Sequence, residues 1–208
     1  MADPDPFRMA LKQPGQFKLK ADLKAADNAQ VIELSALRVA ILTVSDRASR
    51  GVYEDKSGPA LQNLVVQTLH GTVAHTRIVP DEREKIARCL REWADGDPAI
   101  DVILTTGGTG FAPRDVTPEA TRDVIDKEAA GLAEVMRATA LQITPHAMLS
   151  RAVAGIRGRT LIINLPGSPK AAIENLRAIL PVIPHAVALL RDDPSSEAGH
   201  HFHKHHNV

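Results

Sequence analysis

The chain has 208 residues, 44% of them hydrophobic, which suits one well-buried domain with additional terminal segments. Lysine plus arginine and aspartate plus glutamate both total 25, so no global basic field favours nucleic acid or an anionic membrane. The sequence shows no secretory signal and no stretch approaching the roughly 18 apolar residues of a membrane span. The single cysteine, Cys89, is interpreted as structural in a reducing compartment. We therefore expect a cytoplasmic protein with no nucleic-acid or membrane partner.

Three regions differ in composition. Residues 1–36 mix proline, lysine, aspartate and glutamine without periodicity, and we expect an extension without chemistry of its own. Residues 37–192 carry the regular apolar patterns of a domain. Residues 193–208 form a tail with five histidines, a composition that is compatible with metal binding or with a disordered end.

The first half of the domain alternates strands with helices. Leu37–Val44 is nearly continuous in aliphatic residues, which predicts a central strand, and an amphipathic helix follows Ser57. Val73–Val79 predicts a second strand, Glu82–Gly96 a second helix, and Ile100–Thr106 another buried strand. This order favours a parallel or mostly parallel sheet with helices on both faces, which binds ligands beyond the carboxyl ends of its strands.

The second half returns to the same elements. Thr117 is expected to cap a helix that continues to Leu141 with a break near Gly131. Two extended runs, RAVAGI and TLIINL, then precede a turn at Pro166 and a helix from about Ser168. Pro181 and Pro184 are expected to divide that last helical stretch, which closes near Arg191.

The segment Thr105–Thr121, TTGGTGFAPRDVTPEAT, is the strongest indication of a ligand site. Its three glycines let a phosphate or a ring approach the backbone, and successive free N–H groups can cradle an anion. A bare GGTG is more often a tight turn, but Arg114, Asp115 and the helix start at Thr117 place charge and a positive helix end beside it. No Gly-Lys-Ser/Thr follows, so it is not a P-loop, and Pro113 replaces the third glycine of a dinucleotide-binding fingerprint.

Two carboxylates lie in turns at predicted strand ends. Asp81 and Asp115 are expected to meet at one edge of the sheet, where they can hold Mg²⁺ against a triphosphate while the ion keeps several waters. The competing interpretation makes Asp81 the cap of the helix that begins in EREK.

Three further segments are candidates. Ser45–Gly58 follows the first strand, and Asn164–Ala172 contains a Pro166–Gly167 turn with Ser168 at a helix start. Ser150 and Arg151 add a hydroxyl and a guanidinium before a strand. The chain lacks a GxSxG elbow and metal-ligand spacing among His70, His75, His146 and His185, which favours phosphoryl or nucleotidyl transfer by positioning and charge over covalent catalysis.

Four segments together resemble one family. They are LTVSDRASRGVYEDKSGPAL, ILTTGGTGFAPRDVTPEAT, MLSRAVAGIRGRTLIINLPGSPKAA and PHAVALLRD. Over about Leu37 to Asp192 the chain is similar to the molybdopterin adenylyltransferases, which include the G domain of gephyrin. The resemblance implies a three-layer α/β/α sandwich with a mostly parallel central sheet, a homotrimer, and adenylyl transfer from Mg-ATP to the terminal phosphate of molybdopterin.

The resemblance also implies roles for individual residues. Asp81 and Asp115 are expected to be the essential, magnesium-binding aspartates. The nucleotide side is expected to be lined by Gly107, Gly108, Thr109 and Gly110, and the pterin side by Ser45, Asp46, Ser150, Arg151, Pro166, Gly167 and Ser168. A molybdate-inserting enzyme is the expected partner. Paralogues with TGGTG but no TPEAT continuation, and insertion enzymes with SGG, match less well. The alternative function is a non-catalytic molybdopterin carrier or scaffold.

Overall fold

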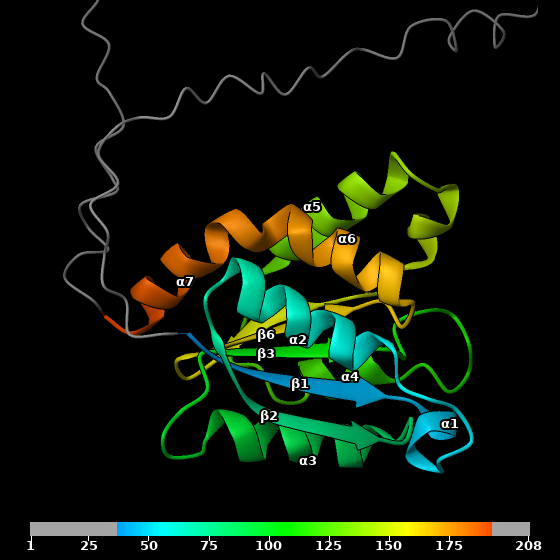
Figure 1. Cartoon of the computed structure of the whole chain (residues 1–208), viewed down its shortest axis with the longest axis horizontal. Coiled ribbons are helices and arrows are strands. Elements are labelled where there is room, and N and C mark those ends of the chain that lie inside the picture. Colours follow the sequence, from blue (N-terminus) through cyan, green and yellow to red (C-terminus); the bar gives the residue numbers. More distant parts are fainter. Residues whose placement is uncertain (1–36, 193–208) are drawn as a thin grey trace, which may run out of the picture. The chain divides into compact units, whose positions relative to one another are not determined.

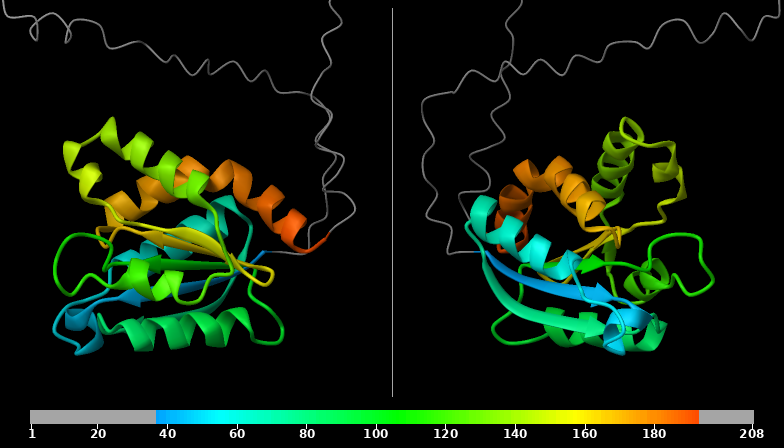
Figure 2. Two further views of the ribbon diagram at one scale, coloured as in Figure 1. Left: turned by 180° about the vertical axis from the view of Figure 1, so that it is seen from behind. Right: turned by 45° about the vertical axis from the view of Figure 1, so that its right-hand side comes forward.

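A computed structural model describes residues 37–192, so the N-terminal extension and the histidine-rich tail lie outside the described residues. The described part contains a six-stranded sheet in the order β2-β1-β3-β6-β5-β4 (Figure 1). Helices cover both faces of this sheet, which confirms the predicted three-layer architecture. Figure 2 shows the same layers from behind and from one side.

Three buried strands form the middle of the sheet. They are β1 (Arg38–Val44), β3 (Val102–Thr106) and β6 (Thr160–Leu165), and they run parallel to one another. Every residue of β3 and β6 is buried. Successive side chains of a strand point to opposite faces of the sheet. Because helices cover both faces, the odd and the even positions of these strands must both be apolar, which explains the continuous aliphatic runs in the sequence.

The outer strands are more exposed. β2 (Thr72–Val79) pairs with β1 in parallel at one edge, and only Val79 of this strand is buried. At the other edge, β5 (Ala154–Arg157) runs antiparallel to β6 and pairs with the two-residue β4 (Lys127–Glu128). The prediction of a mostly parallel sheet is therefore confirmed, with one antiparallel strand joined to β6 by the tight turn after Arg157.

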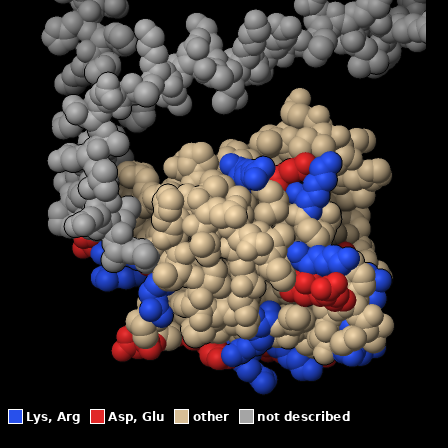
Figure 3. All heavy atoms as spheres, in the orientation of Figure 1, with Lys and Arg blue, Asp and Glu red and all other residues tan. Residues whose placement is uncertain are grey.

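The helices divide into two layers with separate apolar cores. One layer contains α2 (Ser57–Thr68), α5 (Ala130–Leu141), α6 (Pro169–Ile179) and α7 (Ile183–Leu190), and the other contains α3 (Arg83–Ala94) and α4 (Thr117–Arg122). Ile41, Leu104 and Ile163 face the first layer, whereas Leu42, Ile103 and Ile162 face the second. The short helix α1 (Asp46–Ser49) and the 3₁₀ turns Pro145–Leu149 and Leu180–Val182 lie between these elements. Figure 3 shows that the visible surface over α2 is largely uncharged.

The predicted helix from Thr117 to Leu141 is wrong in its middle. The helix ends at Arg122, and the chain joins the sheet edge before α5 begins at Ala130, so Gly131 lies within the first turn of α5. The backbone N–H groups of Asp126 and Ala129 donate to carbonyls on either side of Gly155 in β5. This segment pairs with β5, and Val124 is buried in the core. These tertiary contacts replace the helix that the local sequence favours.

The helical run Pro169–Leu190 is unusually apolar. It is long and apolar enough to cross a membrane by length and composition alone, with a mean hydropathy of 1.4, although we expected no stretch to approach this. Its residues Leu176, Ile179, Ile183 and Val187 are nevertheless fully or almost fully buried in the first core. A single core helix meets the same criterion, so we interpret this run as part of the domain core.

Candidate active site

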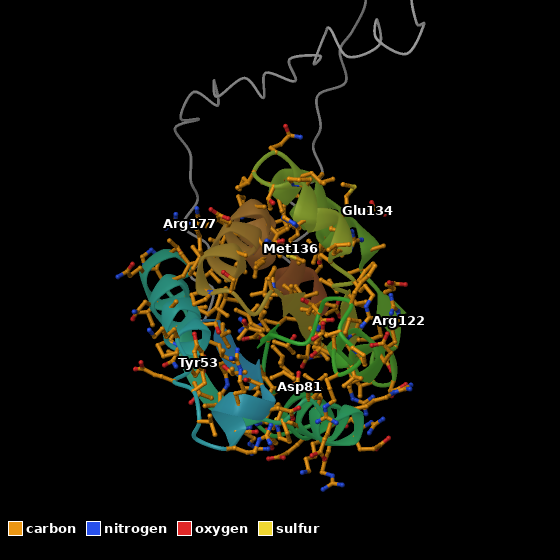
Figure 4. All side chains as sticks on the ribbon, turned by 90° about the vertical axis from the view of Figure 1, so that its right-hand side faces the viewer. Tyr53, Asp81, Arg122, Glu134, Met136 and Arg177 are labelled. Carbon is orange, nitrogen blue, oxygen red and sulfur yellow. The ribbon has the colours of Figure 1, made fainter. Side chains whose placement is uncertain are left out.

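The carboxyl ends of β1, β2, β3 and β6 meet at a cavity of about 590 Å³. We call it the main cavity; it is lined by Thr43–Ala48, Tyr53, Asp55, Lys56, Ser57, Asp81, Thr106, Gly107, Gly108, Asp115, Gly167, Ser168 and Pro169. Figure 4 labels two of these residues, Asp81 at the lower centre of the view and Tyr53 to its left. The position agrees with the general rule that open parallel sheets bind ligands beyond their strand carboxyl ends.

The glycine turn after β3 brings neighbouring strand ends close together. Gly107 and Gly108 have φ values of +105° and +62°, a region that side chains other than glycine rarely adopt. A Cβ on Gly107 would overlap the carbonyl oxygen of Val44 at the end of β1. A Cβ on Gly167 would lie 3.2 Å from the Cα of Gly107. The three loops pack backbone against backbone, which is why this turn needs glycine.

Thr117 has a different role from the predicted one. It is the first residue of α4 rather than its N-cap, which is Val116. Its hydroxyl donates to the carbonyl of Gly107 at 2.9 Å, and its backbone N–H donates to the carbonyl of Gly108. Thr117 therefore fixes the glycine turn against α4 instead of capping the helix.

Asp46 and Asp81 hold each other's backbone. A carboxylate oxygen of Asp81 accepts from the N–H of Asp46 at 2.7 Å, and a carboxylate oxygen of Asp46 accepts from the N–H of Asp81 at 3.1 Å. Glu82, not Asp81, is the N-cap of α3, so the interpretation of Asp81 as a helix cap is wrong. The other carboxylate oxygen of Asp81 would lie 3.1 Å from a Cβ on Gly108, which places Asp81 against the glycine turn.

The two aspartates differ in protonation equilibrium. Burial is the main cause that raises the pKa of Asp81, and the nearby carboxylates of Asp46 and Asp115 raise it further. The pKa of Asp46 is lowered, chiefly because Arg114 donates two hydrogen bonds to its carboxylate at 2.8 and 3.0 Å. Asp81 is thus a half-buried carboxyl group with anionic neighbours, whereas the carboxylate of Asp46 is paired with a cation.

Asp115 faces the same cavity from the loop that follows the glycine turn. One of its carboxylate oxygens accepts from the N–H of Ala112 at 2.9 Å and would lie 2.9 Å from a Cβ on Gly110. Asp81 and Asp115 therefore share a cavity, as the sequence predicts. No group of three or more His, Cys, Asp or Glu side chains within residues 37–192 is arranged to hold a metal by itself.

Arg151 clamps the loop that carries Asp115. Its guanidinium donates to the carbonyl of Gly110 at 2.7 Å and to that of Asp115 at 2.5 Å, and it forms an ion pair with Glu119. Its backbone N–H also donates to the carbonyl of Thr109 at 2.9 Å. Burial is the largest single influence on Glu119 and would raise its pKa, but the hydrogen bond from Arg151, a backbone hydrogen bond and the charges of Arg151 and Arg122 together lower the pKa. These contacts occupy Arg151 with the protein itself.

A second, smaller pocket of about 260 Å³ lies between α5, the following 3₁₀ turn and α6. Four of the predicted site residues line this pocket: Thr109, Gly110, Ser150 and Pro166. The other lining residues are Arg137, Ala140, Ile143, Thr144, His146, Ala147, Leu149, Ala171, Glu174 and Asn175. Most of the surface inside it is apolar, as pockets for flat organic rings usually are. We call it the apolar pocket.

The predicted site residues thus fall into two groups. The main cavity is lined by Ser45, Asp46, Asp81, Gly107, Gly108, Asp115, Gly167 and Ser168. The apolar pocket is lined by Thr109, Gly110, Ser150 and Pro166. Arg151 lines neither and borders a shallow depression beside Phe111. This grouping cuts across the expected division, which placed the glycine turn on one side and Ser45, Asp46 and Ser150 on the other.

Asp55 is a cavity residue that sequence reasoning missed. One carboxylate oxygen accepts from the backbone N–H groups of Ser57 and Gly58, both at 3.0 Å, and the other accepts from the Thr43 hydroxyl at 2.6 Å. The Ser57 hydroxyl in turn reaches the carbonyl of Gly167 at 3.3 Å. The signal was available, because an Asp two residues before a Ser-Gly-Pro helix start is a typical capping pattern.

Comparisons with known proteins agree with this geometry. Residues 40–185 match the family described as probable molybdopterin binding domain. The chain is 47% identical to a molybdopterin adenylyltransferase of Helicobacter pylori, covering 76% of this chain and 89% of that protein. It is 46% identical to gephyrin of Dictyostelium discoideum, of which it spans only 23%.

Solved structures give the same result. The molybdopterin biosynthesis enzyme MoaB of Thermus thermophilus is 54% identical, with a TM-score of 0.71, covering 76% of this chain and 98% of that one. The family match spans more than half of the chain and includes the glycine turn, all four aspartates of the main cavity and every residue that lines the apolar pocket. The chain therefore belongs to the molybdopterin-binding domain family of molybdenum-cofactor biosynthesis proteins.

Proposed function

We propose that this protein is a molybdopterin adenylyltransferase that transfers AMP from Mg-ATP to the terminal phosphate of molybdopterin and releases pyrophosphate. The observation that carries the proposal is the shared cavity of Asp81, Asp115 and the glycine turn. Relatives named molybdopterin adenylyltransferase, 45–47% identical to this chain, support the same activity.

The reaction requires little covalent help from the protein. An oxygen of the pterin phosphate forms a bond with the α-phosphorus of ATP, while the bond from that phosphorus to the oxygen that bridges it to the β-phosphorus breaks. Pyrophosphate leaves with that oxygen and its electron pair, and the attacking phosphate needs no external base. Catalysis then depends on alignment and on offsetting negative charge, which suits a cavity without an activated nucleophile.

The backbone of the main cavity suits phosphate binding. Gly107 and Gly108 carry no side chain that would block an anion, and the N-terminus of α6 at Ser168 opens onto the same space without a side-chain cap. Asp55 already caps the neighbouring N-terminus of α2. We infer that the phosphates inside the main cavity bind nearer to α6 than to α2.

The carboxylates of the main cavity fit a magnesium ion. Mg²⁺ prefers oxygen ligands, is commonly bound by one or two carboxylates with waters and substrate phosphates, and does not need a complete protein cage. The raised pKa of Asp81 reflects burial and anionic neighbours, an imbalance that a divalent cation offsets. Bound Mg²⁺ would neutralise charge on the phosphates and on the leaving pyrophosphate. Asp81 and Asp115 would hold it.

The apolar pocket is the better place for the pterin ring. Thr109, Gly110 and Pro166 belong to loops that also border the main cavity, so the two spaces adjoin along the glycine turn. Ser150, Thr144 and Asn175 supply polar groups that can orient a heteroaromatic ring among apolar side chains. We propose that Arg151 acts on the loop and not on the ring.

The family resemblance is the basis for our proposals on assembly and location. We propose a homotrimer that works in the cytoplasm and passes its product to a molybdate-inserting enzyme. Sedimentation velocity of the full chain tests the trimer, and co-purification with an insertion enzyme tests the partner.

The activity itself is tested by following the labelled adenylyl group. ATP labelled at the α-phosphorus should transfer its label to molybdopterin, whereas label at the γ-phosphorus should appear in pyrophosphate. The alternative is a non-catalytic carrier, motivated by the gephyrin resemblance; it predicts molybdopterin binding with neither transfer. A folded protein that binds the pterin and transfers no label would favour the carrier.

A further inference from the structure

A groove of about 570 Å³ lies beside the main cavity, on the outer side of the loop that contains Asp81. We call it the flanking groove; it is lined by Asp46, Ser49, Arg50, Pro80, Glu82, Lys85 and Arg114. Asp46 lines both spaces, so they adjoin at this residue. The flanking groove is therefore within reach of a ligand that occupies the main cavity.

The two spaces carry opposite excesses of charge. The main cavity is lined by four carboxylates, from Asp46, Asp55, Asp81 and Asp115, and by two cations, Arg47 and Lys56. The flanking groove is lined by three cations, Arg50, Lys85 and Arg114, and by two carboxylates. A triphosphate placed wholly in the main cavity would face that acidic excess, whereas its far end would meet a net cationic surface in the groove.

The groove cations are exposed and make their contacts at the protein surface. The side chains of Arg114 and Lys85 are 61% and 52% exposed in their ion pairs with Asp46 and Glu82. Arg50 donates through Nε to the backbone carbonyl of Asp46 at 2.8 Å, an exposed contact with a neutral acceptor. Exposed ion pairs add little stability, so these cations can exchange their partners for a phosphate at small cost.

We propose that the flanking groove binds the pyrophosphate end of the nucleotide, with Arg50, Lys85 and Arg114 as its ligands. This inference rests on the proposed adenylyl transfer. The α-phosphorus remains in the main cavity, where it bonds to the pterin phosphate, and the β- and γ-phosphates extend past Asp46. The cations stabilise the charge that collects on pyrophosphate as its bond to the α-phosphorus breaks. Arg114 moves from Asp46 to the phosphates when the nucleotide binds.

Lys85→Gln is the cleanest test because Lys85 pairs with Glu82, a residue that does not line the main cavity. We expect the KM for ATP and the inhibition constant of pyrophosphate both to rise by about fivefold or more, since a charged hydrogen bond is lost. The KM for molybdopterin should stay the same. Arg50→Gln should act in the same direction. Lys127→Gln, an exposed lysine in β4, is the matched control and should change none of these constants.

Three outcomes separate the possibilities. Unchanged KM for ATP and unchanged pyrophosphate inhibition in active Lys85→Gln and Arg50→Gln proteins would overturn the inference. The inference also fails if Arg47→Gln and Lys56→Gln produce the effect instead, since the nucleotide would then extend the other way. If the wild type makes no product, the proposed function fails, and calorimetric binding of magnesium pyrophosphate to wild type and Lys85→Gln still decides whether the groove binds this anion.

Discussion

Asp46 and Asp81 form a reciprocal pair in which each carboxylate accepts a hydrogen bond from the other's backbone N–H. The pair joins the end of β1 to the end of β2 and fixes the side chain of Asp81 against the glycine turn. Arg114 then ties Asp46 to the loop that bears Asp115. The relative positions of both proposed magnesium ligands therefore depend on Asp46.

Asp81→Asn should stabilise the protein while abolishing activity. The folded state raises the pKa of Asp81, so its ionised form costs stability at pH 7, and the cost disappears as the pH falls through the raised pKa. Asparagine keeps an acceptor for the N–H of Asp46 without the charge. We expect the unfolding midpoint to rise by about 1–3 °C at pH 7. The increase in the unfolding midpoint should vanish in acid. If the variant is less stable than the wild type at pH 7, the ionised Asp81 does not destabilise the folded protein.

Gly108→Ala should impair both stability and turnover. Its φ is +62°, and its Cβ would overlap the Thr117 hydroxyl and lie 3.1 Å from the Asp81 carboxylate. Gly158→Ala is the matched control, because Gly158 has a φ of +55° but nothing within 4 Å of a Cβ. We expect the control to lose about 1 kcal/mol with full activity, and Gly108→Ala to lose more than about 2 kcal/mol. Chemical denaturation measures the stability loss, and a turnover assay measures the activity. Equal effects of the two substitutions would contradict the close contact of Gly108 with Thr117 and Asp81.

Arg151→Lys should lower kcat more than it raises the KM for molybdopterin. Lysine cannot reach the carbonyls of Gly110 and Asp115 and the carboxylate of Glu119 together, so the loop bearing Asp115 loosens. Glu119→Gln should act in the same direction, with a coupling to Arg151 of about 1 kcal/mol in a double-mutant cycle. A large rise in the KM for molybdopterin at constant kcat would instead make Arg151 a pterin ligand.

The pH dependence of the same pair has a definite sign. Because the folded pKa of Glu119 is lowered, its contribution to stability is present above its unfolded pKa and is lost as the pH falls through the folded value. The stability difference between wild type and Glu119→Gln should therefore be largest near neutrality and disappear in acid. Denaturation at several pH values measures it, and a difference that persists at the lowest pH would contradict the ion pair.

Asp115→Asn should separate binding from turnover. The change removes a magnesium-binding charge and preserves the shape of the side chain, so molybdopterin affinity should survive while turnover falls by about a hundredfold or more. Equilibrium binding of the pterin and a product assay measure the two effects. Equal turnover in variant and wild type would remove Asp115 from the mechanism.

The core of the fold was predictable because its signals are local. The central strands are continuous aliphatic runs in the sequence. Because these strands are parallel, the loops that follow them place Asp81, Gly107 and Gly167 at one edge of the sheet. The segment between Arg122 and Ala130 was predicted wrongly, because its helical propensity is overridden by pairing with β5, a contact that the sequence does not display.

The site was predictable only in part. Asp81 and Asp115 lie in loops that follow strands, so their convergence could be inferred. The clamp formed by Arg151 could not, because its partners Gly110, Asp115 and Glu119 lie more than 30 positions away along the chain. The apolar pocket likewise depends on packing between α5 and α6, and its lining residues Ile143 and Asn175 have no distinctive sequence pattern.

The most direct test of the proposed activity is pyrophosphate release measured with each reactant omitted in turn. The wild-type protein should release pyrophosphate only when molybdopterin, ATP and Mg²⁺ are all present, in equal amount to the adenylylated pterin formed. A folded protein that binds molybdopterin but releases no pyrophosphate, or that releases it equally well without the pterin, would contradict the proposal that the cavity between Asp81 and Asp115 joins these two substrates.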